Sequence, residues 1–216
     1  VIGAGHVGQK VADMAEYLGF NVLRCDPPRA RVEGPEGFCS LEYLVENSQV
    51  ITMHVPLDDM TRGMANADFF TMMQPGAIFI NSARGEVIAE EALIAASPKL
   101  GAIVIDTWCN EPDVNERLID AADIATPHIA GYSYQGKQNG TTMAVRALAA
   151  HFGLDSLAGF VADDSHPDHD PVLLDLKGKN QGEITAVFQY NYPIFTDDFR
   201  FRMEPHKFEK LRSEYQ

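Results

Sequence analysis

The sequence predicts an α/β fold, in which helices cover a doubly wound parallel sheet and a smaller C-terminal α+β unit follows. Three observations point to this fold. Short apolar runs, each long enough for one buried strand, alternate with segments of helical periodicity. A G-x-G-x-x-G turn separates the first apolar pair from the first helical segment. An aspartate ends the second apolar run, about 20 residues further on.

The glycine turn gives each of its glycines a physical task. Gly3 permits the tight turn, Gly5 lets the backbone approach a pyrophosphate, and Gly8 lets the helix lie close to the sheet. The N-terminus of that helix offers N–H groups and a positive dipole end to an anion. Asp26 can accept hydrogen bonds from a ribose diol, and it would repel a 2′-phosphate. The sequence therefore predicts a Rossmann-type domain that binds NAD rather than NADP.

The other elements are predicted in chain order from the spacing of apolar residues and from the glycine, proline and capping residues between them. Apolar residues at helical spacing predict the first helix, which Gly19 ends. Pro27 and Pro28 forbid further pairing of the second strand, and Ser40 is a typical N-cap. The predicted helices are His6–Leu18, Leu41–Glu46, Asp68–Met73, Ala89–Ala96 and Ser133–Phe152, and the predicted strands after the first are Asn21–Cys25, Val50–Met53, Ala77–Asn81, Ala102–Ile105 and Asp123–Ala125.

Beyond Gly153 the character of the sequence changes. Residues 161–170 form an acidic stretch with metal-ligand residue types, namely His166, Asp168, His169 and Asp170. The proline and the acidic flanks favour a solvated linker, so we expect no metal site there. Strand-like runs at Val172–Leu176 and Ile184–Tyr190 then precede a charged helical tail over about Glu204–Tyr215.

Composition limits the partners. The chain has 216 residues, 45% of them apolar, and a formal net charge of −14, which argues against a nucleic-acid partner. No apolar run is long enough for a membrane span. The cysteines, Cys25, Cys39 and Cys109, form no C-x-x-C pair, which favours a reducing cytoplasm. Because the chain starts at Val1, two residues before the glycine turn, we expect it to be a fragment of a longer protein.

Polar side chains follow the predicted strands, and they should lie together because ligands bind beyond the carboxyl ends of parallel strands. Taken singly, Arg84 could be a surface arginine, Glu111 a turn carboxylate and His128 a loop histidine. Their occurrence at successive strand ends favours a catalytic set instead. His54 could equally make a structural hydrogen bond or contact a ligand. The residues at these ends are Asp26, His54, Asn81–Gly85, Asp106–Trp108, Asn110–Pro112 and Pro127–His128.

These segments resemble a known family. Asn-Ser-Ala-Arg-Gly, Asp-Thr-Trp, Asn-Glu-Pro and Thr-Pro-His-Ile-Ala-Gly, in this order behind the glycine turn, are similar to the D-2-hydroxyacid dehydrogenases over residues 1–152. Cys25–Arg29, and His128–Tyr132 followed by Gly136 and Lys137, resemble the subfamily that acts on 4-phospho-D-erythronate in pyridoxal 5′-phosphate (vitamin B6) biosynthesis. The resemblance implies NAD-dependent oxidation of a small phosphorylated 2-hydroxy acid at C2, which gives (R)-3-hydroxy-2-oxo-4-phosphooxybutanoate.

The resemblance also implies a role for each site residue. Arg84 would clamp the substrate carboxylate, which suits its planar guanidinium, and His128 would be the general base. Glu111 would orient the imidazole and stabilise its protonated form, and Tyr132 would contact the substrate. The glycine turn and the resemblance together predict cofactor contacts at Gly3, Gly5, His6, Val7, Gly8, Asp26, Val55, Ser82, Ala83, Arg84, Asp106 and Gly131.

The family organisation implies three parts and leaves two alternatives open. Residues 1–131 would form the NAD-binding domain, residues 132–153 a long helix leading back to a substrate domain, and residues 154–216 a dimerisation domain. We therefore expect a cytoplasmic homodimer without a nucleic-acid or membrane partner. One alternative is a family member that acts on 3-phosphoglycerate, glycerate or glyoxylate/hydroxypyruvate. The other is an NAD-sensing interaction protein of the same fold, which would need no proton acceptor.

Overall fold

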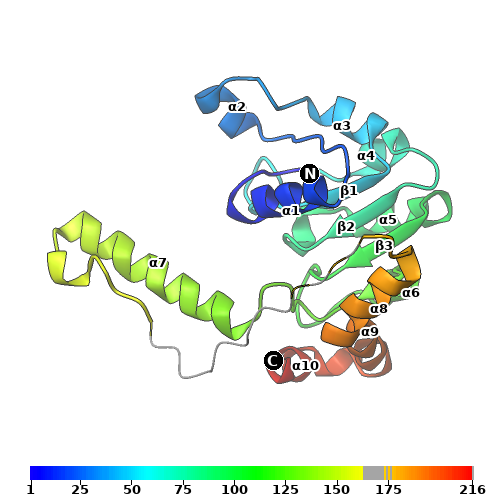
Figure 1. The fold of residues 1–216 in the computed structure, drawn as a ribbon. Helices are drawn as coiled ribbons and strands as arrows, with labels where there is room; N and C mark the ends of the chain where they lie inside the picture. Colours follow the sequence, from blue (N-terminus) through cyan, green and yellow to red (C-terminus); the bar gives the residue numbers. More distant parts are fainter. Residues whose placement is uncertain (163–172, 174, 176, 216) are drawn as a thin grey trace.

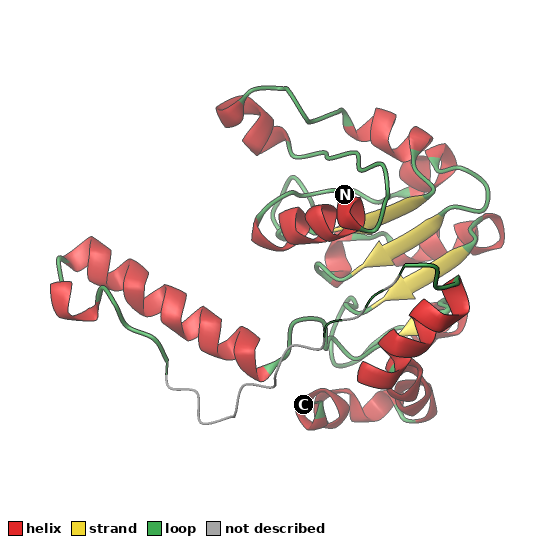
Figure 2. Ribbon diagram, in the orientation of Figure 1, coloured by secondary structure: helices red, strands yellow, loops and turns green. Residues whose placement is uncertain are grey.

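The structure is a computed structural model that describes residues 1–162, 173, 175 and 177–215. Its centre is a parallel sheet in the order β1-β2-β3-β4, with helices on both sides (Figures 1 and 2). The continuous apolar runs form these strands because both faces of the sheet are covered. The strands are β1 (Val50–Met53), β2 (Ile78–Asn81), β3 (Ala102–Ile105) and β4 (Ile124–Ala125).

Ile2 extends the sheet beyond β1. It forms parallel bridges to Met53 on one side and to Cys25 on the other. The chain therefore runs from Ile2 outward to Cys25 and then returns to β1 on the opposite side, which is the switch point where such sheets bind ligands. The predicted strand Asn21–Cys25 is wrong in extent, since only Cys25 is paired as a strand residue. The carbonyl of Arg24 accepts a hydrogen bond from the N–H of Cys39 at 2.9 Å, outside any strand ladder.

The predicted helices of the first 152 residues are present, and two more accompany them. Pro27 and Pro28 begin a helix, because Asp26 caps it and proline suits a first turn. A second unpredicted helix is capped by Asn115. The helices of this region are α1 (His6–Tyr17), α2 (Pro27–Glu33), α3 (Leu41–Asn47), α4 (Ala67–Met72), α5 (Glu90–Ala96), α6 (Glu116–Ala121) and α7 (Tyr134–Phe152).

The hydrophobic core lies between the sheet and the helices. Phe69 and Phe70 of α4 pack edge-on against Phe79 of β2, with ring centroids 6.0 and 5.2 Å apart. All three side chains are buried. Trp108 follows β3, is also buried, and packs edge-on against Phe201 at 5.4 Å. Aromatic edge-to-face contacts of this kind fix the orientation of the loops that leave the strands.

The described part of the C-terminal segment is helical and forms α8 (Gln181–Asn191), α9 (Ile194–Met203) and α10 (Phe208–Glu214). The strand predicted at Ile184–Tyr190 is therefore wrong, because those residues lie in α8. Its N-terminus carries a capping box of Asn180 and Glu183, which outweighs the β propensity of the residues that follow. No strand occurs in residues 177–215, whereas the run Val172–Leu176 and the cluster His166–Asp170 lie outside the residues that the structure describes, apart from 173 and 175.

Helices α9 and α10 pack onto the sheet domain. Phe201 and Phe208 belong to the same core cluster as the strands. The carboxylate of Asp198 accepts a hydrogen bond of 2.6 Å from the backbone N–H of Ala125 in β4. Arg202 donates to the carbonyls of Ile119 and Ala122. Residues far apart in sequence are thereby brought to the carboxyl end of β4.

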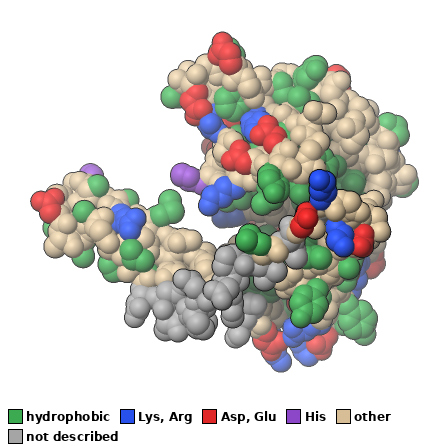
Figure 3. Space-filling view, in the orientation of Figure 1, with side chains coloured by type: hydrophobic (Ala, Val, Ile, Leu, Met, Phe, Trp, Pro, Cys, Tyr) green, Lys and Arg blue, Asp and Glu red, His purple; other side chains and the backbone are tan. Residues whose placement is uncertain are grey.

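Helix α7 projects from this body as an arm (Figures 1 and 3). Apolar side chains along it are exposed, among them Met143, Leu148 and Phe152. Apolar side chains gathered on one element indicate a surface that packs against another part of a protein or a partner. Among the residues that the structure describes, no helix is long and apolar enough to cross a membrane.

Candidate active site

The glycine turn leads from Ile2 into α1. The space around each position explains why a glycine stands there. Gly3 has a positive φ of 83°, and a Cβ there would lie 2.7 Å from the backbone of His54. A Cβ on Gly8 would lie only 1.9 Å from the carbonyl oxygen of Gly3. A Cβ on Gly5, in contrast, would meet nothing within 4 Å. Gly3 and Gly8 therefore serve the packing of the turn, and Gly5 leaves its outer side open.

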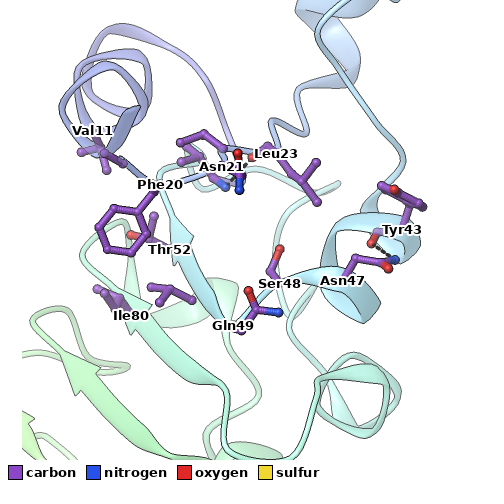
Figure 4. Close-up of a pocket in the computed structure, with 14 residues that line it drawn as sticks. Val11, Phe20, Asn21, Leu23, Tyr43, Asn47, Ser48, Gln49, Thr52 and Ile80 are labelled. Atoms are coloured by element: carbon purple, nitrogen blue, oxygen red, sulfur yellow. Dashed lines mark hydrogen bonds between the residues drawn. The ribbon is translucent and has the colours of Figure 1, made fainter. Parts of the chain in front are cut away.

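A cavity of about 420 Å³ lies over this turn. Its position at the N-terminus of a helix of twelve residues suits an anion such as a pyrophosphate. A larger cavity of about 590 Å³ lies between α1, α3 and β1 and contains none of the predicted site residues (Figure 4). We therefore assign the smaller cavity to the cofactor; it is lined by Ala4, Gly5, His6, Gln9, Lys10 and Arg29.

Asp26 ties the glycine turn to α2. One of its carboxylate oxygens accepts a hydrogen bond from the N–H of Ala4 at 2.8 Å, and the other caps α2 through the N–H of Arg29 at 3.0 Å. Arg29 in turn donates to the carbonyl of Ala4 and forms a salt bridge with Glu33. The carboxylate thus lies beside the turn, where its remaining lone pairs can accept from a ribose. These residues fit NAD, and Glu33 neutralises the neighbouring guanidinium.

A buried asparagine shapes the loop that carries Arg84. Asn81 ends β2 and is 0% exposed. Its amide donates to the carbonyl of Arg84 and to the hydroxyl of Thr107, and its oxygen accepts from the N–H of Ala83 at 3.1 Å. The Arg84 side chain is exposed, and its Nη1 donates to the carbonyl of Ala83 at 2.6 Å. Within the described chain it forms no ion pair with a carboxylate, so its charge is available to a ligand.

Gly85 brings this loop against the one that follows β3. A Cβ on Gly85 would lie 1.9 Å from the carbonyl carbon of Trp108 and 2.3 Å from the nitrogen of Cys109. Only glycine allows that approach. Trp108 is fixed in turn, because its indole N–H donates to the carbonyl of Thr126 at 2.9 Å. The loops that carry Arg84 and Glu111 are therefore in backbone contact.

Glu111 and His128 form a hydrogen-bonded pair. The Nδ1 of His128 lies 2.7 Å from Oε2 of Glu111, and both side chains are about four-fifths buried. Oε1 of Glu111 accepts from the N–H of Trp108 at 2.9 Å. Burial opposes ionisation of Glu111, but the hydrogen bonds from His128 and Trp108 outweigh it and lower the pKa of the carboxyl. The ionised carboxylate places the proton on Nδ1 and leaves Nε2 as an acceptor.

Asp106 holds the loop on which His128 stands. Its carboxylate accepts hydrogen bonds from the Thr126 hydroxyl and from the N–H groups of Ile129 and Ala130, all within 3.0 Å. The backbone N–H of His128 donates to the Asp106 carbonyl at 2.8 Å. Burial raises the pKa of Asp106, and these hydrogen bonds oppose that rise. The same contacts hold His128 at a φ of 55°, which is unfavourable for a residue with a side chain.

The remaining predicted residues lie around this pair and the glycine turn. Tyr132 follows His128, and its ring contacts the ammonium of Lys137 and the guanidinium of Arg212. His54 makes a hydrogen bond of 2.9 Å with Thr52, and burial lowers the pKa of its ring to about 4. Val7 and Gly131 are exposed, and Val55 and Ser82 are half-buried near the ends of β1 and β2.

The structure thus joins some of the predicted residues directly and others through their loops. Glu111 and His128 are in contact, whereas Arg84 reaches them only through the backbone contact of Gly85. Sequence reasoning missed Asn81 as the residue that shapes the loop, although its position at a strand end was a signal. It also missed Arg212, which lies in the charged helical tail and follows no predicted strand. In the described part of the chain, no three His, Cys, Asp or Glu side chains are grouped to hold a metal ion.

Comparisons with known proteins identify the family of the chain. The family described as D-isomer specific 2-hydroxyacid dehydrogenase, NAD binding domain, matches residues 1–130. An erythronate-4-phosphate dehydrogenase of Bacteroides thetaiotaomicron is 37% identical over all of this chain, which spans 61% of that protein. One of Hydrogenovibrio crunogenus is 39% identical over 94% of the chain, which spans 54% of it. The chain therefore spans between about half and about three-fifths of the length of these relatives.

The solved structures point the same way. The D-lactate dehydrogenase of Aquifex aeolicus, complexed with NAD and lactic acid, aligns with a TM-score of 0.61 and 28% identity, over 76% of this chain and 56% of that one. The D-mandelate dehydrogenase of Rhodotorula graminis aligns with a TM-score of 0.56 and 31% identity, over 62% of this chain and 42% of that one. Both structures share the fold of this chain. The chain belongs to the D-isomer specific 2-hydroxyacid dehydrogenases, and residues 1–130 are its NAD-binding domain.

Proposed function

We propose that the whole protein oxidises 4-phospho-D-erythronate at C2 with NAD and so acts in pyridoxal 5′-phosphate biosynthesis. The observation that carries the proposal is the hydrogen bond between His128 and Glu111, which follow β4 and β3 at the same sheet edge as the glycine turn. The substrate is taken from the names of the relatives that match over the chain. A proton acceptor at the sheet edge that carries a dinucleotide turn suits the oxidation of an alcohol, and mere binding of a dinucleotide does not require one.

In the proposed reaction, NAD held at the glycine turn would supply the acceptor for the hydride that leaves C2. Nε2 of His128 takes the proton of the C2 hydroxyl, so that the C–O single bond becomes a carbonyl. Glu111 holds the imidazole through Nδ1 and stabilises the positive charge that the ring acquires. Arg84 holds the substrate carboxylate, for which a guanidinium is the suitable group. Product and reduced cofactor leave, and the proton on Nε2 returns to water.

The assembly and location belong to the same proposal. We place the protein in the cytoplasm as a homodimer that meets neither nucleic acid nor membrane. Exposed aromatic side chains on the C-terminal helices, among them Phe188, Phe195 and Phe199, support a partner surface there. The free cysteines of the chain support a reducing compartment.

The test is NADH formation with 4-phospho-D-erythronate by the full-length protein and by its His128→Ala variant. We expect the variant to lose turnover by about 100-fold or more, because the base acts in the transition state, while its Kd for NAD changes little. His206→Ala serves as a control, since that histidine is exposed on the short turn before α10. Turnover by His128→Ala equal to that of the wild type would contradict the proposal. NAD binding without turnover in the wild type would favour the NAD-sensing alternative.

A further inference from the structure

Arg212 lies in the active-site region although it comes from the last helix. It stands in α10, and its guanidinium carbon is 4.9 Å from the ring centroid of Tyr132, four residues after His128. Its charge also acts on Glu111 and helps to keep that carboxyl ionised, as shown by the lowered pKa. Figure 1 shows the end of α10 beneath the loop that leads into α7. Two separate interactions thus place Arg212 beside the catalytic pair.

The guanidinium of Arg212 lacks one hydrogen-bond acceptor, which a buried donor needs. Its Nε is buried and has no hydrogen-bond partner among the described residues. Other arginines of the C-terminal helices are paired, Arg200 with Glu214 at 2.5 Å and Arg202 with Asp198 at 2.9 Å. A guanidinium can only donate, and a buried donor without an acceptor is costly. An anionic ligand would supply the missing acceptor.

A second cation lies at the same ring. Nζ of Lys137 is 3.7 Å from the ring centroid of Tyr132. Lys137 is in the first turn of α7, a helix of 19 residues, where the dipole disfavours a positive charge. Two cations on one ring also repel each other. A bound anion would offset both the unfavourable helix dipole and the repulsion between the two cations. The chain as a whole is strongly acidic, so it offers little attraction for an anion elsewhere.

We propose that Arg212, together with Lys137, binds the phosphate group of a phosphorylated 2-hydroxy acid at this active site. The inference rests on the proposed function, in which Arg84 holds the carboxylate at the other end of the substrate. The planar fork of Arg212 gives paired hydrogen bonds to phosphate oxygens, and Lys137 adds a point charge. Tyr132 provides the surface on which both cations rest. The C-terminal helix thereby selects phosphorylated over unphosphorylated acids.

The first test compares kcat/KM for 4-phospho-D-erythronate and D-erythronate in the full-length protein. Arg212→Gln should lower the ratio of the two values by about 10- to 100-fold, mainly through the KM of the phosphorylated acid. Lys137→Gln should lower it less, and Arg212→Lys should restore part of it. Lys210→Gln is the matched control, because it removes the same charge from an exposed position on the same helix. An unchanged ratio in Arg212→Gln, or an equal loss for both acids, would overturn the proposal.

A second test needs no turnover and keeps the inference separate from the proposed reaction. Binding of inorganic phosphate in the presence of NAD is measured by calorimetry for the wild type, Arg212→Gln, Arg212→Lys and Lys210→Gln. We expect phosphate binding in the wild type and Lys210→Gln, its loss in Arg212→Gln and partial retention in Arg212→Lys. If the wild type oxidises neither acid, this pattern still supports an anion site while the proposed function fails. Equal phosphate affinity in the wild type and Arg212→Gln, or no binding by the wild type, would overturn the inference.

Discussion

Glu111 and His128 come from different loops, and their contact depends on how each loop is anchored. The Glu111 carboxylate is held by the N–H of Trp108, whose indole is fixed to Thr126. The His128 loop is held by the buried carboxylate of Asp106. Each half of the pair is thus held by a buried residue just after β3, Asp106 one residue and Trp108 three residues past its end. At the scale of residues, the proposed chemistry depends on this loop as much as on the imidazole itself.

Replacing Glu111 tests the orientation of the imidazole. In Glu111→Gln the amide can either donate to Nδ1 or accept from it, so it no longer fixes the tautomer or stabilises the charged ring. We expect kcat to fall by about 100-fold or more, with little change in Kd for NAD. Steady-state kinetics and a cofactor titration check this, and a loss confined to NAD binding would show that Glu111 serves the cofactor instead.

His54 predicts a pH dependence of stability. Burial lowers the pKa of its ring to about 4, from a reference value of 6.5. The folded state therefore binds fewer protons than the unfolded state, and stability is lost as the pH falls from 6.5 towards 4. After allowance for its partial solvation, we expect the wild type to lose about 2 kcal/mol more than His54→Gln over this window. Urea unfolding at pH 7 and 4.5 measures the difference, and parallel losses in both proteins would contradict it.

At the scale of elements, different glycines of the turn should serve the stability of the fold and the binding of the cofactor. A Cβ on Gly8 would collide with the carbonyl oxygen of Gly3, so we expect Gly8→Ala to reduce the free energy of unfolding by about 3 kcal/mol. A Cβ on Gly5 would meet nothing, so Gly5→Ala should fold normally and weaken NAD binding about tenfold or more. Urea unfolding and NAD titration of both variants check this. Destabilisation by Gly5→Ala, or a stable Gly8→Ala, would contradict the assignment of the turn.

Most elements of the sheet domain could be predicted, because each strand is a short apolar run and each helix is capped or periodic. Two of the departures from the predicted elements come from competing local signals. Pro27 was read as a break, although a proline after a capping aspartate begins a helix as readily as it ends a strand. Ile184–Tyr190 was read as a strand from its β-branched and aromatic residues, although Asn180 and Glu183 form a capping box. In both cases the cap decided the outcome.

The site was predictable to the extent that it follows strand ends. Arg84, Glu111 and His128 could be expected at one edge because parallel strands end together. Arg212 could not, because the place of α10 depends on how the preceding helix α9 is fixed to the sheet domain through contacts 73 to 83 residues apart in sequence. The buried role of Asn81 depends likewise on its neighbours in β3 and the following loop. The sequence pattern thus predicts which residues lie at the carboxyl edge of the sheet. Residues that reach the site through tertiary packing, such as Arg212, cannot be predicted in this way.

At the scale of the whole molecule, α9 is fastened to the sheet domain by a pair of charged residues. Asp198 accepts from Ala125 in β4 and pairs with Arg202, which donates to two carbonyls around α6. Asp198→Ala leaves that guanidinium without its carboxylate, so we expect a loss of about 2 to 3 kcal/mol.

The matched control for this change is an exposed ion pair. Arg117 and Glu91 are each 67% exposed and pair at 2.9 Å, so Arg117→Gln should cost less than about 1 kcal/mol. Thermal and urea unfolding of both variants give the comparison. A loss in Asp198→Ala no larger than in Arg117→Gln would mean that α9 contributes little to the stability of the sheet domain.

We propose that the whole protein oxidises a phosphorylated four-carbon 2-hydroxy acid at this site. The most direct measurement is kcat/KM for NADH formation by the full-length protein with 4-phospho-D-erythronate, 3-phospho-D-glycerate and D-glycerate. We predict a clear preference for 4-phospho-D-erythronate, with D-glycerate the poorest substrate because it carries no phosphate. A preference for 3-phospho-D-glycerate or D-glycerate would contradict the proposed substrate, and no NADH with any of the three, despite NAD binding, would contradict the proposed enzyme activity.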